Sequence, residues 1–190
     1  MLEIPTLEQV EKELERLRYS SRYRSILRST VNTLIVAIAI AIIIATLILP
    51  IFRIYGTSMT PTLVEGDMVA ATKTERPNRG DLIAFYYNNK ILVKRVIAIP
   101  GEWVNIDKDG NVYVNDKLLD EPYIKQKALG QCDIKLPYQV EQGRYFVMGD
   151  LRDVSIDSRT TSIGCIPQEQ ITGRLILKIW PLNRLGLIRN

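Results

Sequence analysis

The feature that constrains this chain most is an apolar run from Val31 to Leu49, which contains no charged residue and only three polar ones. A helix formed there would be apolar on every face, which is unusual for the core helix of a soluble protein. At about 1.5 Å per residue the run spans roughly 28 Å, close to the thickness of a bilayer's hydrocarbon core. Pro50 ends the helix. We therefore expect a transmembrane anchor over residues 31–50.

The flanks of this run predict its orientation and argue against a cleaved signal sequence. Five arginines and no acid occur between residues 16 and 28, and basic flanks stay in the cytoplasm. The basic region and the apolar run are both longer than in a signal sequence, and no small-x-small site follows the run. We expect a single-pass membrane protein with residues 1–30 cytoplasmic and residues 51–190 extracytoplasmic. The sequence leaves open whether the membrane is a plasma membrane or a thylakoid membrane.

The first residues carry a helical pattern of their own. Leu7, Val10, Leu14 and Leu17 recur at helical spacing with glutamates between them. This spacing predicts a short amphipathic helix, which lies on the membrane surface, contacts a partner or is frayed.

Composition excludes several kinds of site. The chain has no histidine, which excludes a Ser-His-Asp triad, a Cys-His dyad and any histidine-ligated metal site. Neither metal nor cofactor is implied. The net charge of +4 is too small to indicate nucleic-acid binding. Cys132 and Cys165 lack metal-like spacing, and whether they pair stays open.

The region after the anchor has the pattern of short strands separated by turns. Residues 82–87 and 91–99 flank Asn88-Asn89, and residues 104–106 and 112–114 flank Asp109-Gly110. Both pairs are typical of β-hairpins. Further strands are expected over 67–71, 145–148 and 175–180. These features predict a mainly β fold: an antiparallel β domain after the anchor, with a small irregular β subdomain over about 102–144.

Two residues stand out as candidates for chemistry. Ser58 lies in a short run of small and turn-forming residues, between Gly56 and Pro61 and nine residues past the apolar run. Lys94 lies in a strand pattern that is apolar on both faces, which indicates burial unless its side chain reaches water at the strand end. A desolvated lysine has a lowered pKa and, when neutral, can take a proton from a serine hydroxyl.

A third stretch is unusually polar for its position. Residues 149–159 contain three acids, two arginines and two serines directly after an apolar strand. Such density suits a hydrogen-bonded loop that orients another group, although a solvated loop would have the same composition.

Together these stretches resemble the type I signal peptidases over about residues 52–182. The motifs are Gly-x-Ser-Met-x-Pro-Thr-Leu, Gly-Asp-Leu-Ile-x-Phe, Val-Lys-Arg-Val-Ile-x-x-Pro-Gly and Gly-Asp-x-Arg-x-x-Ser-x-Asp-Ser-Arg, in that order. The resemblance implies a membrane-bound serine endopeptidase that removes signal peptides from exported preproteins. Its partners would be those preproteins and the lipid bilayer, with export machinery as an open third partner, and no nucleic acid.

The resemblance also implies roles for individual residues. Ser58 aligns with the nucleophile, Lys94 with the general base and Ser155 with the serine that orients the lysine. The residues expected in structural ion pairs are Asp157 with Arg159 and Asp150 with Arg95. Candidate walls of the substrate pocket, which would accept small residues, are Phe52, Ile54, Gly56, Met59, Leu92 and Val93.

Two positions depart from the family pattern. Leu151 stands where an asparagine is usual, so one loop hydrogen bond is expected to be missing. Gly56 stands where some members carry a serine that donates a hydrogen bond to the oxyanion of the transition state. The oxyanion hole of this chain would therefore depend mainly on the Ser58 amide. One such donor stabilises the transition state by about 2.7–4 kcal/mol.

Two alternatives to a signal peptidase remain. A self-cleaving Ser-Lys protease of the repressor type would require an internal cleavage site and usually a DNA-binding segment, and the anchor argues against it. A membrane-tethered, non-catalytic β module that binds peptides would tolerate loss of Ser58 and Lys94.

Overall fold

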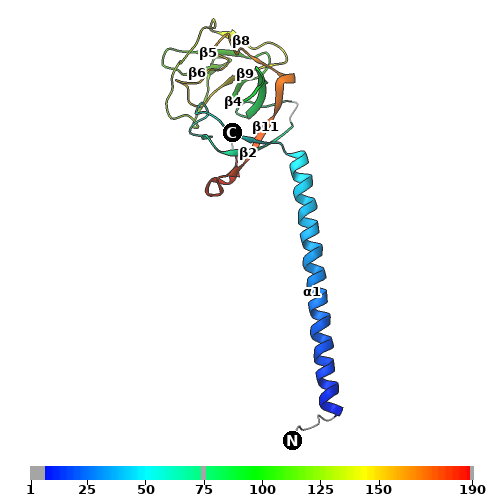
Figure 1. Cartoon of the computed structure of the whole chain (residues 1–190). Coiled ribbons are helices and arrows are strands. Elements are labelled where there is room, and N and C mark those ends of the chain that lie inside the picture. Colours follow the sequence, from blue (N-terminus) through cyan, green and yellow to red (C-terminus); the bar gives the residue numbers. More distant parts are fainter. Residues whose placement is uncertain (1–6, 74–75, 189–190) are drawn as a thin grey trace. The chain divides into compact units, whose positions relative to one another are not determined.

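The structure, a computed structural model, describes residues 7–73 and 76–188 and divides into two units, a helix up to Ile48 and a β unit from Leu49. Helix α1 (Leu7–Ile48) is continuous over 42 residues (Figure 1). Residues 7–17, predicted as a short amphipathic helix, are helical, but they form the first part of this long helix rather than a short one. Neither glycine nor proline occurs between residues 7 and 49, so nothing in the sequence breaks the helix there.

Within α1, residues Ile26–Ile43 have a mean hydropathy of 2.1 and are long and apolar enough to cross a membrane. In the described residues this is the one segment with that property. This segment overlaps the predicted anchor over residues 31–50. Where a membrane-spanning segment would begin and end stays a prediction.

The larger of two antiparallel sheets has the strand order β1-β2-β11-β3-β4-β9-β10, and β12 pairs with β11. Its strands are β1 (Ile51–Arg53), β2 (Met68–Thr72), β3 (Leu82–Tyr87), β4 (Lys90–Ala98), β9 (Arg144–Met148), β10 (Ile166–Pro167), β11 (Ile171–Trp180) and β12 (Gly186–Leu187). Two short 3-10 helices follow β10 and β11, η1 (Gln168–Gln170) and η2 (Leu182–Arg184).

The smaller sheet has the order β7-β6-β5-β8. Its strands are β5 (Trp103–Ile106), β6 (Val112–Val114), β7 (Lys117–Leu118) and β8 (Tyr138–Gln139). β5, β6 and β8 lie together on one side of the β unit (Figure 1). The predicted fold class, mainly antiparallel β after an N-terminal apolar helix, is confirmed.

Turn chemistry explains why both predicted hairpins form. Asn88 and Asn89, which join β3 to β4, have φ values of 44° and 62°. Asparagine adopts this left-handed region more readily than most residues, and a turn of two such residues matches the twist of the strands. The second hairpin pairs β5 with β6 through Val104↔Val114, as predicted.

Apolar side chains form separate clusters around the sheets. One contains Ile54, Met59, Leu63 and Leu82, and a second contains Ile83, Phe85, Val96 and Val147. Since Leu82 and Ile83 are neighbours in β3, these clusters cover opposite faces of the larger sheet. A third cluster joins Ile97 and Phe146 to the smaller sheet.

Two strands of the larger sheet keep an unpaired edge. β1 pairs only with β2 in the described residues. In β4, residues Lys90 to Val93 pair with β3, whereas β9 pairs with Arg95, Val96 and Ala98 only. The backbone of β1 and of the first half of β4 is therefore available to another extended chain.

Candidate active site

Ser58 lies in the loop between β1 and β2, and buried apolar residues of this loop fix its position. Met59 and Leu63 pack in the cluster that contains Ile54 and Leu82, and they are 2% and 0% exposed. The amide of Leu63 donates to the Met59 carbonyl at 2.9 Å, and the Thr60 amide donates to the Thr57 carbonyl at 2.9 Å. The apolar neighbours thus hold the turn, while the Ser58 side chain stays partly accessible.

The Lys94 side chain reaches this serine from β4. Its Nζ lies 2.7 Å from Ser58 Oγ, and the residue is only 4% exposed. Burial lowers the pKa of Lys94 from 10.5 to about 8, an effect that the Asp157 carboxylate opposes and the Arg159 guanidinium assists. A large part of the lysine population is therefore neutral near pH 8, and the amine is within hydrogen-bonding distance of a hydroxyl.

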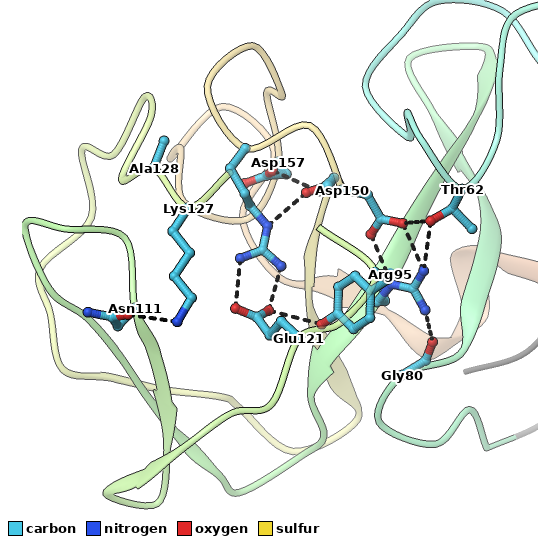
Figure 2. A network of polar contacts seen from close by, with 12 residues as sticks. Thr62, Gly80, Arg95, Asn111, Glu121, Lys127, Ala128, Asp150 and Asp157 are labelled. Carbon is cyan, nitrogen blue, oxygen red and sulfur yellow. Dashed lines mark hydrogen bonds and ion pairs between the residues drawn. The ribbon is translucent and has the colours of Figure 1, made fainter. Parts of the chain in front are cut away.

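Arg95, the next residue, points to the other side of the strand and forms a buried ion pair. Its Nε and one terminal nitrogen donate to Asp150 at 2.9 and 2.8 Å. The other terminal nitrogen donates to the Gly80 carbonyl at 2.8 Å, and the Thr62 hydroxyl also donates to Asp150 (Figure 2). The family resemblance implied a pair of Arg95 with Asp150, and the two side chains do form an ion pair in the structure.

The polar loop after β9 is ordered by a second buried pair. Arg159 Nε donates to Asp157 at 2.8 Å, and both side chains have zero exposure. Asp157 also accepts a bond of 3.0 Å from the Gly149 amide. One terminal nitrogen of Arg159 also donates to Asp157 at 2.9 Å, and its terminal nitrogens donate to the backbone carbonyls of residues 128, 129, 152 and 155. The charged side chains of Asp157 and Arg159 therefore form a buried network, whereas Asp153, Val154 and Ile156 of the same loop are exposed.

Ser155 is buried and, like the Ser58 carbonyl, lies beside Gly149, but it does not form the hydrogen bond with Lys94 that was expected. It is 1% exposed, and its Oγ has no hydrogen-bond partner among the described residues. The expected hydrogen bond from Ser155 to Lys94 is therefore not formed in this structure, although the residue lies next to Gly149 at the centre of the loop. Its role in orienting the lysine stays a prediction.

A cavity of about 570 Å³ opens at the Ser58–Lys94 contact. It is lined by both residues, by β1 and the segment after it, and by the first half of β4. All six candidate pocket residues line it: Phe52, Ile54, Gly56, Met59, Leu92 and Val93. Five other lining residues, Ile51, Arg53, Tyr55, Lys90 and Ile91, were not among the predicted wall residues. Period-2 alternation would place Ile51, Arg53 and Tyr55 on the face opposite Phe52 and Ile54, so the strand pattern gave no signal for them.

Several polar residues near the site were also missed. Glu121 pairs with Arg152, and the Tyr123 ring packs 3.8 Å from the Arg95 guanidinium. Arg152 lies within the last family motif, whereas Glu121 and Tyr123 come from the irregular region after β7 and carried no local signal.

The two cysteines do not form a disulfide with each other. Cys132 and Cys165 are both free thiols, and burial raises the pKa of Cys165 to about 11. Within residues 7–73 and 76–188, no cluster of three acidic, cysteine or histidine side chains could hold a metal ion.

These features define a class: a mainly β protein with an N-terminal apolar helix, whose cavity contains a serine beside a buried lysine. The family model described as signal peptidase, peptidase S26, matches residues 27–180. The chain therefore belongs to the signal peptidase family, peptidase S26.

Named relatives are similar to this chain over most of its length. A signal peptidase IB of Staphylococcus aureus is 37% identical over 156 residues, covering 72% of this chain and 80% of the relative. A signal peptidase I of Bacillus licheniformis is 35% identical over 147 residues, covering 70% and 78%. A crystal structure of a signal peptidase I from Enterococcus faecalis V583 is 33% identical, with a TM-score of 0.45, covering 53% of this chain and 97% of that one. The resemblance drawn from the motifs is confirmed.

Proposed function

We propose that this chain is a membrane-bound endopeptidase that removes signal peptides from exported preproteins, with Ser58 as nucleophile and Lys94 as general base. The observation that carries the proposal is the 2.7 Å contact between Lys94 Nζ and Ser58 Oγ at the end of the cavity. The low exposure of Lys94 supports a neutral amine, which is the form a base requires.

The first half of the reaction would form an ester. The neutral Lys94 amine accepts the Ser58 hydroxyl proton as Oγ attacks the carbonyl of the residue before the cut. The peptide bond then breaks, the lysine returns the proton to the leaving amine, and the mature protein departs with a free N-terminus. The signal peptide remains attached to Ser58 through an ester bond.

The second half would use the same lysine. Lys94 takes a proton from a water molecule, which attacks the ester and releases the signal peptide with a new carboxylate. In both halves negative charge develops on the carbonyl oxygen, and the Ser58 amide, which donates to no other described residue, is the available donor. Gly56 adds no side-chain donor, consistent with its departure from some members of the family.

The substrate would bind as an extended strand between β1 and the first half of β4. Both have an unpaired edge, and both line the cavity. A chain added to these edges makes backbone hydrogen bonds, and alternate side chains point to the cavity walls. The walls at Phe52, Ile54, Met59, Leu92 and Val93 favour small apolar residues at the first and third positions before the cut.

The apolar helix would tether this site to the bilayer that also holds the signal peptide. Residues 26–43 are long and apolar enough to span it, and the arginines before them support a cytoplasmic N-terminus. Confining enzyme and substrate to one membrane raises their effective concentration.

The test is cleavage of a purified preprotein by the detergent-solubilised full chain. We expect the Ser58→Ala protein to be inactive while its far-UV circular dichroism and thermal midpoint match the unchanged protein. Thr57→Ala is the matched control, because it removes an exposed hydroxyl next to Ser58 and should keep activity. Processing by purified Ser58→Ala protein would refute the nucleophile and favour a site that only binds peptides.

A further inference from the structure

The loop after β9 directly supports the backbone of Ser58. The Leu151 amide donates to the Ser58 carbonyl at 3.0 Å. Gly149 lies so close that a Cβ there would come within 2.6 Å of the same carbonyl oxygen. Because these contacts hold the peptide group of Ser58, a shift of residues 149–151 would move its Oγ relative to Lys94.

Arg152 holds this loop in place by bridging two partners. Its Nε donates to the Gly149 carbonyl at 2.9 Å, and its two terminal nitrogens donate to Glu121 at 3.2 and 2.5 Å. Both side chains have zero exposure. A guanidinium can make these bonds at once because its donors lie in one rigid plane, which a lysine ammonium cannot reproduce.

Glu121 reaches the loop from a different part of the chain, the irregular segment after β7 of the smaller sheet. The Tyr123 hydroxyl donates to Glu121 at 2.9 Å, and the Tyr123 ring lies 3.8 Å from the Arg95 guanidinium. Arg95 in turn holds Asp150. In Figure 2, dashed lines join Glu121 to its hydrogen-bond partners and Arg95 to Asp150. Glu121 is thus linked to the loop at two points, Gly149 and Asp150.

We propose that Glu121 is a positioning residue for the nucleophile, acting through Arg152 on the loop that holds the Ser58 carbonyl. Glu121 does not touch the reacting atoms. It is the carboxylate that pairs with Arg152 in the described part of the chain, and a buried guanidinium without its carboxylate pulls toward water or toward other acceptors. The Gly149 carbonyl, which already accepts from Arg152, is such an acceptor, so loss of Glu121 loosens the turn that supports Ser58.

The activity readout of this inference rests on the proposed function, so the test includes a second readout that does not. Full-length protein in detergent is compared as wild type, Glu121→Gln, Arg152→Lys and Val112→Ala. Val112 is fully buried in the smaller sheet, its apolar side chain takes no part in the ion pair of Glu121 with Arg152, and it serves as a control for stability. For each variant we measure kcat and KM for a preprotein well below the thermal midpoint, and hydrogen exchange of the amides of residues 149–152.

Glu121→Gln and Arg152→Lys should each lower kcat at least about ten-fold, since a small misplacement of a reacting group is costly, and leave KM within about two-fold. Both should speed exchange at residues 149–152. Val112→Ala should lower the thermal midpoint but keep kcat and local exchange. Arg152→Lys keeps the positive charge beside Glu121 but loses the planar set of donors that bridges Glu121 and Gly149. If Glu121→Gln does not fold, this variant tests whether the bridge positions Ser58.

The proposal is overturned if the folded variants keep wild-type kcat and wild-type exchange. It is also overturned if Val112→Ala, at a similar loss of thermal stability, shows the same losses as Glu121→Gln. If the wild type does not cleave the preprotein, the proposed function fails, and the exchange data alone still decide whether Glu121 orders the loop.

Discussion

Replacing Lys94 by methionine should abolish cleavage and at the same time stabilise the β unit. Methionine keeps most of the aliphatic volume of lysine and removes the amine. Lowering the pKa of Lys94 from 10.5 to about 8 corresponds to a cost of about 3 kcal/mol for keeping the ammonium form in the fold. The lost hydrogen bond to Ser58 offsets about 1 kcal/mol of this gain. We expect a net increase of about 2 kcal/mol in unfolding free energy at pH 7.

Proton linkage predicts how the stability difference between Lys94→Met and the wild type changes with pH. The folded state holds Lys94 with a pKa of about 8, below the 10.5 of an unfolded chain. Between these pH values the unfolded state binds more protons, so wild-type stability rises with pH through this window. The full free-energy cost of burying the Lys94 ammonium group is present below pH 8, and it is gone above pH 10.5. The stability advantage of Lys94→Met should therefore shrink as pH rises from about 8 to about 10.5.

The measurement is urea unfolding of both full-length proteins at several pH values, followed by tryptophan fluorescence. Trp103 and Trp180 are the tryptophans of the chain, and both lie in the β unit, so the signal reports this unit. Wild-type cleavage should rise with pH through about 8 in parallel. A Lys94→Met protein less stable than wild type at pH 7, or a stability difference that does not change with pH, would contradict a desolvated base.

Three further substitutions probe the loop after β9, residues 149–159. Ser155→Ala should slow cleavage yet raise the thermal midpoint slightly, because the buried hydroxyl has no partner to lose; unchanged kcat would remove it from the site. Gly149→Ala should cost several kcal/mol in urea unfolding and abolish cleavage, because its methyl group would come within 2.6 Å of the Ser58 carbonyl. Asp157→Asn should shift the pH–rate midpoint below that of wild type, because the carboxylate raises the pKa of Lys94; a shift to higher pH would contradict this.

Much of the β fold could be predicted because its signals are local. The β3–β4 hairpin follows from two asparagines between apolar runs, and Asn88 and Asn89 do adopt positive φ. The burial of Lys94 followed from apolar residues on both faces of its strand, and the structure leaves it 4% exposed. Its contact with Ser58 came from the order of family motifs, since no local pattern relates residues 36 positions apart.

The parts that were missed depend on distant partners or very short elements. β7, β8, β10 and β12 have two residues each, too few to show an alternating pattern. Glu121 lies 31 residues from Arg152 and sits in a polar segment, where an acid is ordinarily solvated. Its burial is visible only once the smaller sheet is placed beside the loop.

Two buried ion pairs near Lys94 explain how this lysine can be neutral in a region rich in charged residues. Asp150 is held by Arg95 and Asp157 by Arg159, each at 2.8 Å between buried side chains, so an arginine partly offsets the charge of each carboxylate. Arginine does not release its proton, whereas lysine does so when it is desolvated. Lys94 has no ion pair in the described residues, and burial is the largest influence on its pKa. A substitution that frees Asp150 or Asp157 from its arginine therefore acts on catalysis through the protonation of Lys94 as well as through stability.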